Sequence, residues 1–299
     1  MKTLFYRVIY NKYINFILRH INKFFYPVLP KKIKIPPSGT VKVKINSKKL
    51  IFATNQTNYI TNLLFWEGYK NFEYTDIFLS LIKNVDSFFD IGANIGYYSL
   101  IAAITNPEIS VYSFEPAEGP FHYLKINIER NNLINIKAEK IAISEKTGEI
   151  EFFETYSKKY KYIKYNLGGE SNAAHEKHHK NFKKSVVKTE TLDNYFKKSE
   201  ATSIDLIKLD TEGTEPLILS ESTEVINLMK PIIICETLFN TTEEELETIL
   251  KPFDYEFYNH TENGLKLVET IKRTQDNGAR NCFFVHPSKK HLIEKFIVS

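Results

Sequence analysis

Residues 88–104, FFDIGANIGYYSLIAAI, decide the fold class of this chain of 299 residues. An apolar strand enters a glycine turn, and a helix follows the turn directly. Outward along the chain, the same order repeats through apolar strands that end at Glu115, Asp210 and Glu236. The pattern predicts an α/β fold with a mostly parallel sheet covered on both faces. Further expected elements are a strand at 134–144, a strand at 149–154 and a helical segment at 216–229.

Four of the predicted strands end in a carboxylate, because Asp90 closes the first strand as Glu115, Asp210 and Glu236 close the others. In a doubly wound sheet the carboxyl ends of the strands border the ligand crevice. These four acids are therefore expected to face one site. The alternative is that each acid only caps or begins the following helix.

The glycine turn at 90–96, DIGANIG, indicates what this site binds. Gly92 and Gly96 would let the backbone approach a ligand where a side chain would collide. Glu115 follows Gly96 by 19 residues and closes the next strand, which suits bidentate hydrogen bonding to ribose hydroxyls. The turn therefore indicates a nucleoside-containing cofactor.

Charge favours S-adenosylmethionine over a nicotinamide dinucleotide. Asp90 would repel a pyrophosphate, whereas S-adenosylmethionine has no phosphate and carries an ammonium and a sulfonium. No Lys or Arg lies between Asp90 and Leu100, and Asn94 stands where G-x-G-x-x-G has its middle glycine. Acids without bases suit a cationic cofactor.

These residues resemble the FkbM-type S-adenosylmethionine-dependent methyltransferases over 65–287. The resemblance is carried by FFDIGANIGYYSL (88–100), VYSFEP (111–116), NNLINI (131–136), KTGEIEF (146–152), IDLIKLDTEGTE (204–215), PIIICE (231–236) and NCFFVHP (281–287). It implies a Rossmann-like class I methyltransferase sheet of seven strands, the last of them antiparallel.

The resemblance also implies a set of cofactor contacts. The glycine turn would surround the methionine part, Glu115 the ribose, and the chain near Ala142 and Ser144 the adenine, although no acid is evident there. The expected contacts are Asp90, Gly92, Ala93, Asn94, Gly96, Tyr97, Glu115, Pro116, Ala142 and Asp210.

Methyl transfer to a hydroxyl needs the acceptor held close to the sulfonium carbon, and a base that takes up the hydroxyl proton helps. Asp210 would orient the cofactor, and Glu212 or Glu236 would accept the proton. Glu212 and Glu215 are equally suited to the first turn of a helix. Asp210 with Glu236 would suit Mg²⁺, but no third ligand is apparent, so the metal site stays unknown. DTEG (210–213) replaces the Asn-Pro-Pro-Tyr-like residues of amino-methylating enzymes, which favours oxygen as the acceptor.

Residues 154–185 have the composition of a substrate loop, with eight lysines against three glutamates. Tyrosines stack on sugar C–H faces, and the lysines would favour an anionic acceptor. A solvated surface loop is the alternative. Its chemistry-bearing residues are Tyr156, Tyr160, Tyr162, Tyr165, Asn166, Gly168, Gly169, Ser171, Asn172 and the histidines His175, His178 and His179, which would be metal ligands or surface residues.

The first 66 residues form a basic region, with twelve Lys/Arg and no Asp or Glu, against 28 basic and 36 acidic residues in the remainder. A basic amphipathic helix is predicted before Pro27 and Pro30, and the alternating VKVKI at 41–45 predicts a strand. The helix is expected on the domain, on a partner chain, or in a membrane interface. Its apolar residues are Leu4, Phe5, Val8, Ile9, Tyr13, Phe16, Ile17, Ile21, Phe24 and Phe25, and its polar stripe is Arg7, Asn11, Asn15, Arg19 and Asn22.

We therefore expect two parts, a basic helix with a small β appendage at 1–66 and a methyltransferase domain at 67–299. The predicted function is S-adenosylmethionine-dependent O-methylation of a sugar or glycan precursor in the cytoplasm, with peripheral membrane contact through residues 1–26 and no nucleic-acid partner. Cys235 and Cys282, in apolar runs, are expected to be buried reduced thiols. Alternatives are a lipid or peptide acceptor, a non-catalytic membrane-associated protein of this fold, or a nicotinamide-dependent sugar oxidoreductase. The oligomeric state is left open.

Overall fold

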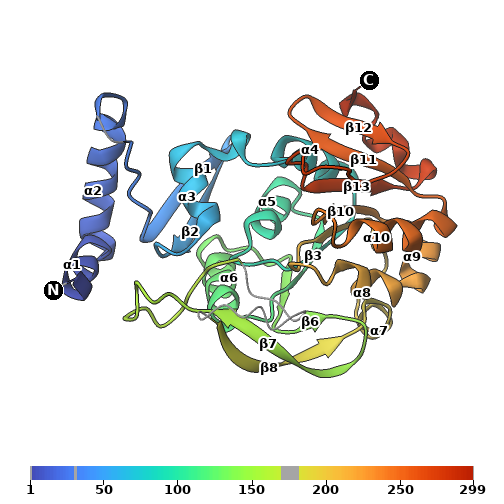
Figure 1. Ribbon diagram of the computed structural model, residues 1–299, viewed down its shortest axis with the longest axis horizontal. Coiled ribbons are helices and arrows are strands. Elements are labelled where there is room, and N and C mark those ends of the chain that lie inside the picture. Colours follow the sequence, from blue (N-terminus) through green and yellow to red (C-terminus); the bar gives the residue numbers. More distant parts are fainter. Residues whose placement is uncertain (1, 30–31, 170–181, 299) are drawn as a thin grey trace.

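A mostly parallel sheet runs through the centre of the protein (Figure 1). The computed structural model describes residues 2–29, 32–169 and 182–298, and nine strands within these ranges form the sheet. Their order is β14 (Ile297–Val298), β12 (Gly264–Val268), β11 (Glu256–Thr261), β13 (Asn281–Val285), β10 (Ile232–Glu236), β9 (Leu206–Leu209), β3 (Ser87–Ile91), β4 (Ser110–Phe114) and β5 (Ile136–Glu139).

Seven neighbouring strands of this sheet, from β5 to β11, confirm the predicted fold class. The strands β5, β4, β3, β9 and β10 are all parallel, and β13, the last of the seven along the chain, runs antiparallel to β10 and β11. The strands β12 and β14 extend the sheet beyond β11. The result is the Rossmann-like class I sheet with two added edge strands.

Alternation along the strands builds a core on each face of the sheet. Phe88 and Val111 pack into one core with the helices α4 (Thr75–Leu81), α5 (Tyr97–Thr105) and α6 (Glu118–Arg130). Phe89 and Phe114 point the other way, because successive strand residues face opposite sides. They pack against α7 (Leu192–Lys198), α8 (Glu215–Ser220), α9 (Thr223–Met229) and α10 (Glu243–Leu250).

A second sheet corrects the prediction of one strand over 134–144. Only β5 joins the main sheet. After a break at Lys140 and Ile141 the chain pairs in parallel with β8, in a small sheet of β6 (Ala142–Ile143), β7 (Gly148–Thr155) and β8 (Phe182–Glu190). The segment 149–154 therefore belongs to this small sheet and not to the central one (Figure 1).

The predicted helical segment 216–229 is likewise two helices. α8 ends at Ser220, and α9 begins at Thr223. The Ser222 hydroxyl donates to the carbonyl oxygen of Ile218, at the end of α8, at 2.6 Å. This hydrogen bond stabilises the turn, because the last carbonyls of a helix lack partners within the helix.

The predicted strand at 41–45 is present as β1 (Gly39–Ile45), which forms a hairpin with β2 (Lys48–Thr54) and is followed by α3 (Tyr59–Trp66). The apolar side of the hairpin, including Val43 and Phe52, belongs to the same core as α4 and α5. Asn127 on α6 fastens it. Its Oδ1 accepts the N–H of Ala53 at 2.6 Å, and its Nδ2 donates to the carbonyl of Ile95 at 2.9 Å. The division at residue 66 stays a prediction.

The N-terminal residues form two helices where one was predicted. α1 (Lys2–Ile9) and α2 (Lys12–Phe25) lie at one edge of the molecule (Figure 1). The break falls at Asn11, whose side chain accepts the N–H of Tyr13 at 3.1 Å and so caps α2. α2 ends two residues before Pro27, and Pro30 lies outside the described residues. No helix in the described ranges is both long and apolar enough to cross a bilayer.

Short 3₁₀ turns complete the fold at η1 (Tyr26–Val28), η2 (Tyr69–Asn71), η3 (Ile82–Asn84), η4 (Lys251–Phe253), η5 (Pro287–Leu292) and η6 (Glu294–Phe296). Cys235 on β10 and Cys282 on β13 lie directly opposite each other in the sheet. Both are buried free thiols, as predicted, and burial raises the pKa of Cys235.

Replacing Asn127 with Ala should lower the free energy of unfolding by about 1 to 3 kcal/mol, because it leaves the buried N–H of Ala53 and the carbonyl of Ile95 without that side chain. Urea denaturation measures the difference. Glu129→Ala, an exposed position on the same helix, is the control and should change stability far less. Equal losses in the two variants would show that Asn127 does not fasten the hairpin.

Candidate functional site

A cavity of about 510 Å³ opens at the carboxyl ends of the central parallel strands. Its walls come from the turn after β3, the residues after β4, the β6 strand, the loop after β9 and the end of β10. The segments 58–60 and 167–169 close it from other parts of the chain. Strands distant in sequence thus bring their ends to one site, as the position of the acids predicted.

Most of the predicted site residues line this cavity, namely Gly92, Ala93, Asn94, Tyr97, Glu115, Pro116, Ala142, Asp210, Glu212 and Glu236. Asp90 and Gly96 do not. Asp90 is 1% exposed, and its carboxylate accepts hydrogen bonds from the backbone N–H and the hydroxyl of Ser99 at the start of α5. The expectation that Asp90 faces the ligand is therefore corrected, because its position in the middle of the sheet places it beneath the turn.

The two glycines of the turn are required by packing within the protein. Gly92 has φ +80°, and a Cβ there would lie 1.9 Å from the carbonyl oxygen of Asp210. Gly96 has φ +88°, and its Cβ would meet side-chain carbons of Leu124 and Leu100 at 2.5 and 2.7 Å. Each glycine thus allows a close approach within the protein, one to the end of β9 and one between α5 and α6, and Gly92 also lines the cavity, so the predicted ligand contact stays a prediction.

The backbone N–H groups of the turn are already bonded within the protein. Those of Gly92 and Ala93 both donate to the carbonyl of Phe114, and that of Gly96 donates to Ala93. Asn94 donates to Glu115, and Ile95 donates to the side chain of Asn94. Phosphate-binding turns instead direct such N–H groups at the ligand. This turn is therefore poorly suited to a pyrophosphate.

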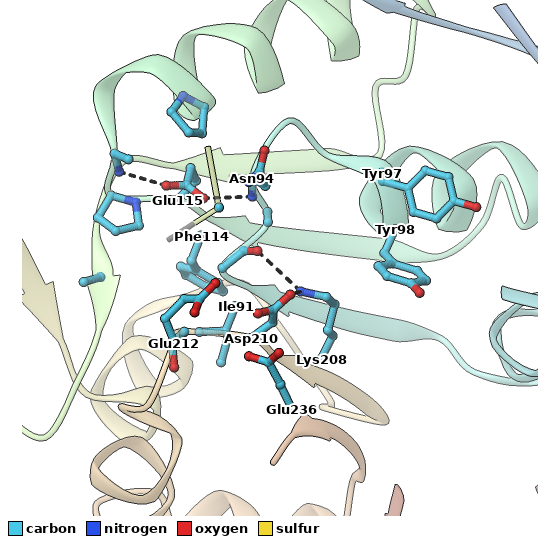
Figure 2. A pocket seen from close by; sticks show the side chains of 18 of the residues that line it. Ile91, Asn94, Tyr97, Tyr98, Phe114, Glu115, Lys208, Asp210, Glu212 and Glu236 are labelled. Carbon is cyan, nitrogen blue, oxygen red and sulfur yellow. Dashed lines mark hydrogen bonds and ion pairs between the residues drawn. The ribbon is translucent and has the colours of Figure 1, made fainter. Parts of the chain in front are cut away.

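Glu115 forms one end of the cavity (Figure 2). Its Oε2 accepts the N–H of Asn94 at 2.8 Å, and its Oε1 accepts the N–H of Ala117 at 2.9 Å. Burial raises the pKa of Glu115 to about 7, against the effect of these two bonds. Each carboxylate oxygen has a second lone pair, so the side chain can also accept hydrogen bonds from two hydroxyls of a ligand.

Lys208 is a site residue that the sequence analysis missed. Its Nζ lies 3.2 Å from Asp210 Oδ2 and 3.7 Å from Asp90 Oδ1, and it donates to the carbonyl of Gly92 at 3.4 Å (Figure 2). Burial alone would lower the pKa of Lys208, but Asp210 and Asp90 raise it. The expectation of acids without a base is therefore wrong. A lysine inside an apolar strand, two residues before Asp210 and so on the same side, was the available signal.

Three acids gather at the other end of the cavity. Carboxylate oxygens of Asp210, Glu212 and Glu236 all lie within 4.8 Å of one another (Figure 2). Burial, followed by the charges of Asp210 and Glu212, raises the pKa of Glu236 to about 8. Its Oε2 is buried and has no hydrogen-bond partner among the described residues. The group is thus suited to accepting a proton or facing a positive charge.

Glu212 and Glu215 were each suited either to catalysis or to the first turn of a helix, and the structure gives them different positions. Glu215 begins α8, and its Oε1 accepts the N–H of Thr211 at 2.7 Å while its Oε2 accepts that of Gly213 at 3.0 Å. It organises the loop and does not line the cavity. Glu212, with φ +60°, sits in the loop itself and does line it. Only Glu212 is therefore placed for chemistry.

Ala142 and Ser144, which were predicted to lie near the adenine, are both in the cavity wall. The missing acid has a structural explanation. Glu139 ends β5, but it accepts a hydrogen bond from the Tyr195 hydroxyl at 3.2 Å and is not in the cavity wall. After Glu139 the chain leaves the central sheet, and it enters the cavity wall only from Ile141 onward.

The predicted substrate loop reaches the cavity only in part. Leu167, Gly168 and Gly169 are in its wall, whereas Tyr156, Tyr160 and Tyr165 line a neighbouring cavity of about 540 Å³. The two cavities share Ala117 and Pro120. Tyr162 instead contacts α1. Ser171, Asn172, His175, His178 and His179 lie outside the described residues.

Two further wall residues, Glu73 and Arg280, lie outside the motifs quoted above. The Tyr98 hydroxyl donates to Glu73 Oε2 at 2.8 Å, and burial raises the pKa of Glu73. Arg280 and Asn281 line the cavity from the start of β13. Nothing local in the sequence marks Glu73 or Arg280, because only the folded chain brings them to the strand ends.

The sequence model of the "Methyltransferase FkbM domain" family matches residues 90–262, more than half of the chain. The chain belongs to the FkbM methyltransferase family. A curated relative, "31-O-demethyl-FK506 methyltransferase FkbM" of Streptomyces tacrolimicus, is 33% identical to this FkbM-family chain over 89 residues, which is 27% of the chain and 34% of the relative. The chain thus matches about a third of the length of that relative.

Solved structures similar to the chain include a methyltransferase FkbM from Methylobacillus flagellatus KT, at 15% identity and a TM-score of 0.44, covering 68% of this chain and 44% of that one. Another is the S-adenosylmethionine-dependent methyltransferase from Agrobacterium tumefaciens, at 9% identity and a TM-score of 0.42, covering 84% and 71%. At these TM-scores the likenesses say nothing about substrate.

Replacing Gly92 with Ala should cost about 2 kcal/mol or more of folding free energy beyond the cost of Gly68→Ala. Gly68 has a similar φ of +85° but no atom within 4 Å of a Cβ, so it isolates backbone strain from the collision with Asp210. Urea denaturation of both variants measures the difference. Equal destabilisation would mean that the turn does not depend on its contact with β9.

Proposed function

We propose that the protein is an S-adenosylmethionine-dependent O-methyltransferase that acts on a hydroxyl of a sugar or glycan precursor. The observation that carries the proposal is the division of the cavity, with Glu115 at one end and the cluster of Asp210, Glu212 and Glu236 at the other. One end suits ribose hydroxyls, and the other suits a cationic sulfonium and ammonium.

The residues of the cavity fit this cofactor better than a dinucleotide. The N–H groups of the turn are used within the protein, so a pyrophosphate would find few donors there. Asp90 is paired with Lys208, but the cavity wall still contains Glu73, Glu115, Asp210, Glu212 and Glu236 against Lys208 and Arg280. This excess of acids supports a cationic ligand and argues against the nicotinamide alternative.

When bound, the cofactor would supply a methyl group on a positively charged sulfur. The chain must then hold the acceptor hydroxyl in line with that carbon and take up its proton. Glu236 is the preferred base, because its pKa of about 8 makes it a stronger proton acceptor than an ordinary carboxylate. Glu212 is the second candidate. The acceptor hydroxyl would lose its proton to a carboxylate oxygen as its own oxygen bonds to the methyl carbon, and the bond from that carbon to sulfur would break.

Two observations support an oxygen acceptor, and a third supports a carbohydrate. The loop DTEG at 210–213 lacks the residues of amino-methylating enzymes, and the name of the curated relative specifies a 31-O-demethyl substrate. The neighbouring cavity is lined by Tyr156 and Tyr165 together with Lys161, Lys164 and Lys183. Tyrosine rings and lysines side by side suit an anionic sugar. A lipid or peptide acceptor stays an alternative, as does a non-catalytic role.

Replacing Glu115 with Ala should weaken binding of S-adenosylhomocysteine by tenfold or more, about 1.5 to 3 kcal/mol, because the ribose would lose a charged acceptor. Titration calorimetry measures the affinity. Glu118→Ala, which removes a half-exposed acid paired with Lys140, is the control and should bind like the wild type. Unchanged affinity in Glu115→Ala, or tighter binding of NAD by the wild type, would contradict the proposed cofactor.

Replacing Glu236 with Gln should reduce turnover by about 10²-fold and leave cofactor affinity within a few-fold. Because the base must be ionised, kcat/KM of the wild type should rise with pH and level off above about 8, and this rise should vanish in Glu236→Gln. Radiolabelled methyl transfer into glycans provides the assay, and Glu221→Gln, an exposed acid, is the control.

Glu212→Gln tests the second candidate base in the same assay. Full turnover in both Glu212→Gln and Glu236→Gln would mean that positioning alone drives the reaction. The magnesium alternative has no support from the comparisons, although Glu212 supplies the third carboxylate that the sequence did not show. Activity lost in EDTA and restored by Mg²⁺ would assign the three acids to a metal instead.

A further inference from the structure

The helix α2 packs against the protein with its polar side. Asn15 and Arg19 are buried at 0% and 1% exposure. The guanidinium of Arg19 donates to the carbonyls of Ser38 and Thr40, and Oδ1 of Asn15 accepts the N–H of Ser38 at 2.7 Å. One turn further on, Oδ1 of Asn22 accepts the N–H of Ile35 at 2.9 Å. The polar stripe of this helix therefore forms hydrogen bonds with the backbone of the segment that follows it.

The apolar side of α2 consequently faces away from the protein. At 3.6 residues per turn, Tyr13, Ile17, Ile21 and Phe24 lie in one row, opposite Asn15, Arg19 and Asn22. Their exposed fractions are 70%, 59%, 50% and 78%. In α1, Leu4, Phe5 and Val8 are exposed as well. The expectation that this face packs on its own domain is thus not met.

Charge indicates what covers this face. Residues 1–66 contain twelve Lys/Arg and no acid, and the exposed residues of the two helices include Lys2, Arg7, Lys12 and Lys23. A second copy of the chain would bring two such basic regions together, and neither offers an acid within residues 1–66. An anionic surface with an apolar interior complements both features.

We propose that α1 and α2 dock the protein on an anionic lipid membrane. The apolar row would enter the boundary between headgroups and acyl chains, and the basic side chains would contact the phosphates. The inference concerns the surface alone and does not require the proposed reaction.

A chain of hydrogen bonds connects α1 to a segment beside the cavity. The Tyr162 hydroxyl donates to the carbonyl of Tyr6 on α1 at 3.0 Å, and Gln56 donates to the same hydroxyl at 2.9 Å. The adjacent Thr57 hydroxyl accepts the N–H of Leu167, which is itself a wall residue, at 2.8 Å. A membrane-bound α1 would therefore be linked through Tyr162 and Gln56 to the segment next to the wall residue Leu167.

Vesicle sedimentation of the full-length chain tests the proposal. The wild type should sediment with vesicles of phosphatidylcholine mixed with phosphatidylglycerol, and much less with phosphatidylcholine alone. Raising the salt concentration should weaken binding without abolishing it, because salt screens only the charged part. The combined variant Ile17→Gln, Ile21→Gln and Phe24→Gln should bind about tenfold or more weakly. Gln does not disfavour a helix relative to Ile or Phe, so the melting temperature should be kept.

A matched control removes three exposed leucines at the opposite end of the molecule, with Leu217→Gln, Leu228→Gln and Leu267→Gln on α8, α9 and β12 (Figure 1). It should sediment like the wild type, and so should Glu236→Gln, which separates docking from turnover. Equal binding by the helix variant and the wild type would overturn the proposal, as would equal losses in both triple variants. Unchanged vesicle binding with an altered oligomer in gel filtration would assign the face to a second copy.

Discussion

The site depends on one buried cation, Lys208, held between Asp90 and Asp210. An unpaired charge buried inside a sheet is costly, and the two carboxylates beside Lys208 offset this cost and raise its pKa. The pairing also joins β3 to β9, and the hydrogen bond from Lys208 to Gly92 adds the glycine turn to the same unit. β3 and β9 are neighbouring strands of the sheet, and the cavity opens at their carboxyl ends. This one interaction therefore holds the base of the cavity in place.

With Asp90 compensated from within, the electrostatic character of the cavity comes from acids at its two ends. Glu115 is set by backbone donors, whereas the cluster around Glu236 is set by mutual repulsion and burial. The first arrangement fixes a geometry for hydroxyls. In the second arrangement, the cluster around Glu236 is stabilised when it binds a positive charge or a proton. Under the proposed function, one end of the cavity would serve recognition and the other reactivity.

The sequence predicted what short-range patterns determine. Short apolar runs next to turns located the strands, and the turn with the acids that follow it identified the family and part of the cavity wall. It missed Lys208, because the partners of a buried lysine are set by strand pairing across more than 100 residues. It placed Asp90 against the ligand for the same reason. The sequence also could not decide which side of α2 packs against the protein. The polar residues of α2 form hydrogen bonds with the backbone of a later segment, and a pattern of side chains does not reveal backbone partners.

The paired cysteines of β10 and β13 give the protein a chemical reporter of its own motions. Cys235 and Cys282 face each other across two strands at the heart of the sheet, both shielded from solvent. An alkylating reagent can reach them only when these strands separate, so the labelling rate counts openings of the sheet's centre. Glu236, which lines the cavity, follows Cys235 directly, so any molecule that binds in the cavity and stabilises β10 would slow the labelling rate. Binding could therefore be detected without a chromophore, a tag or knowledge of the acceptor.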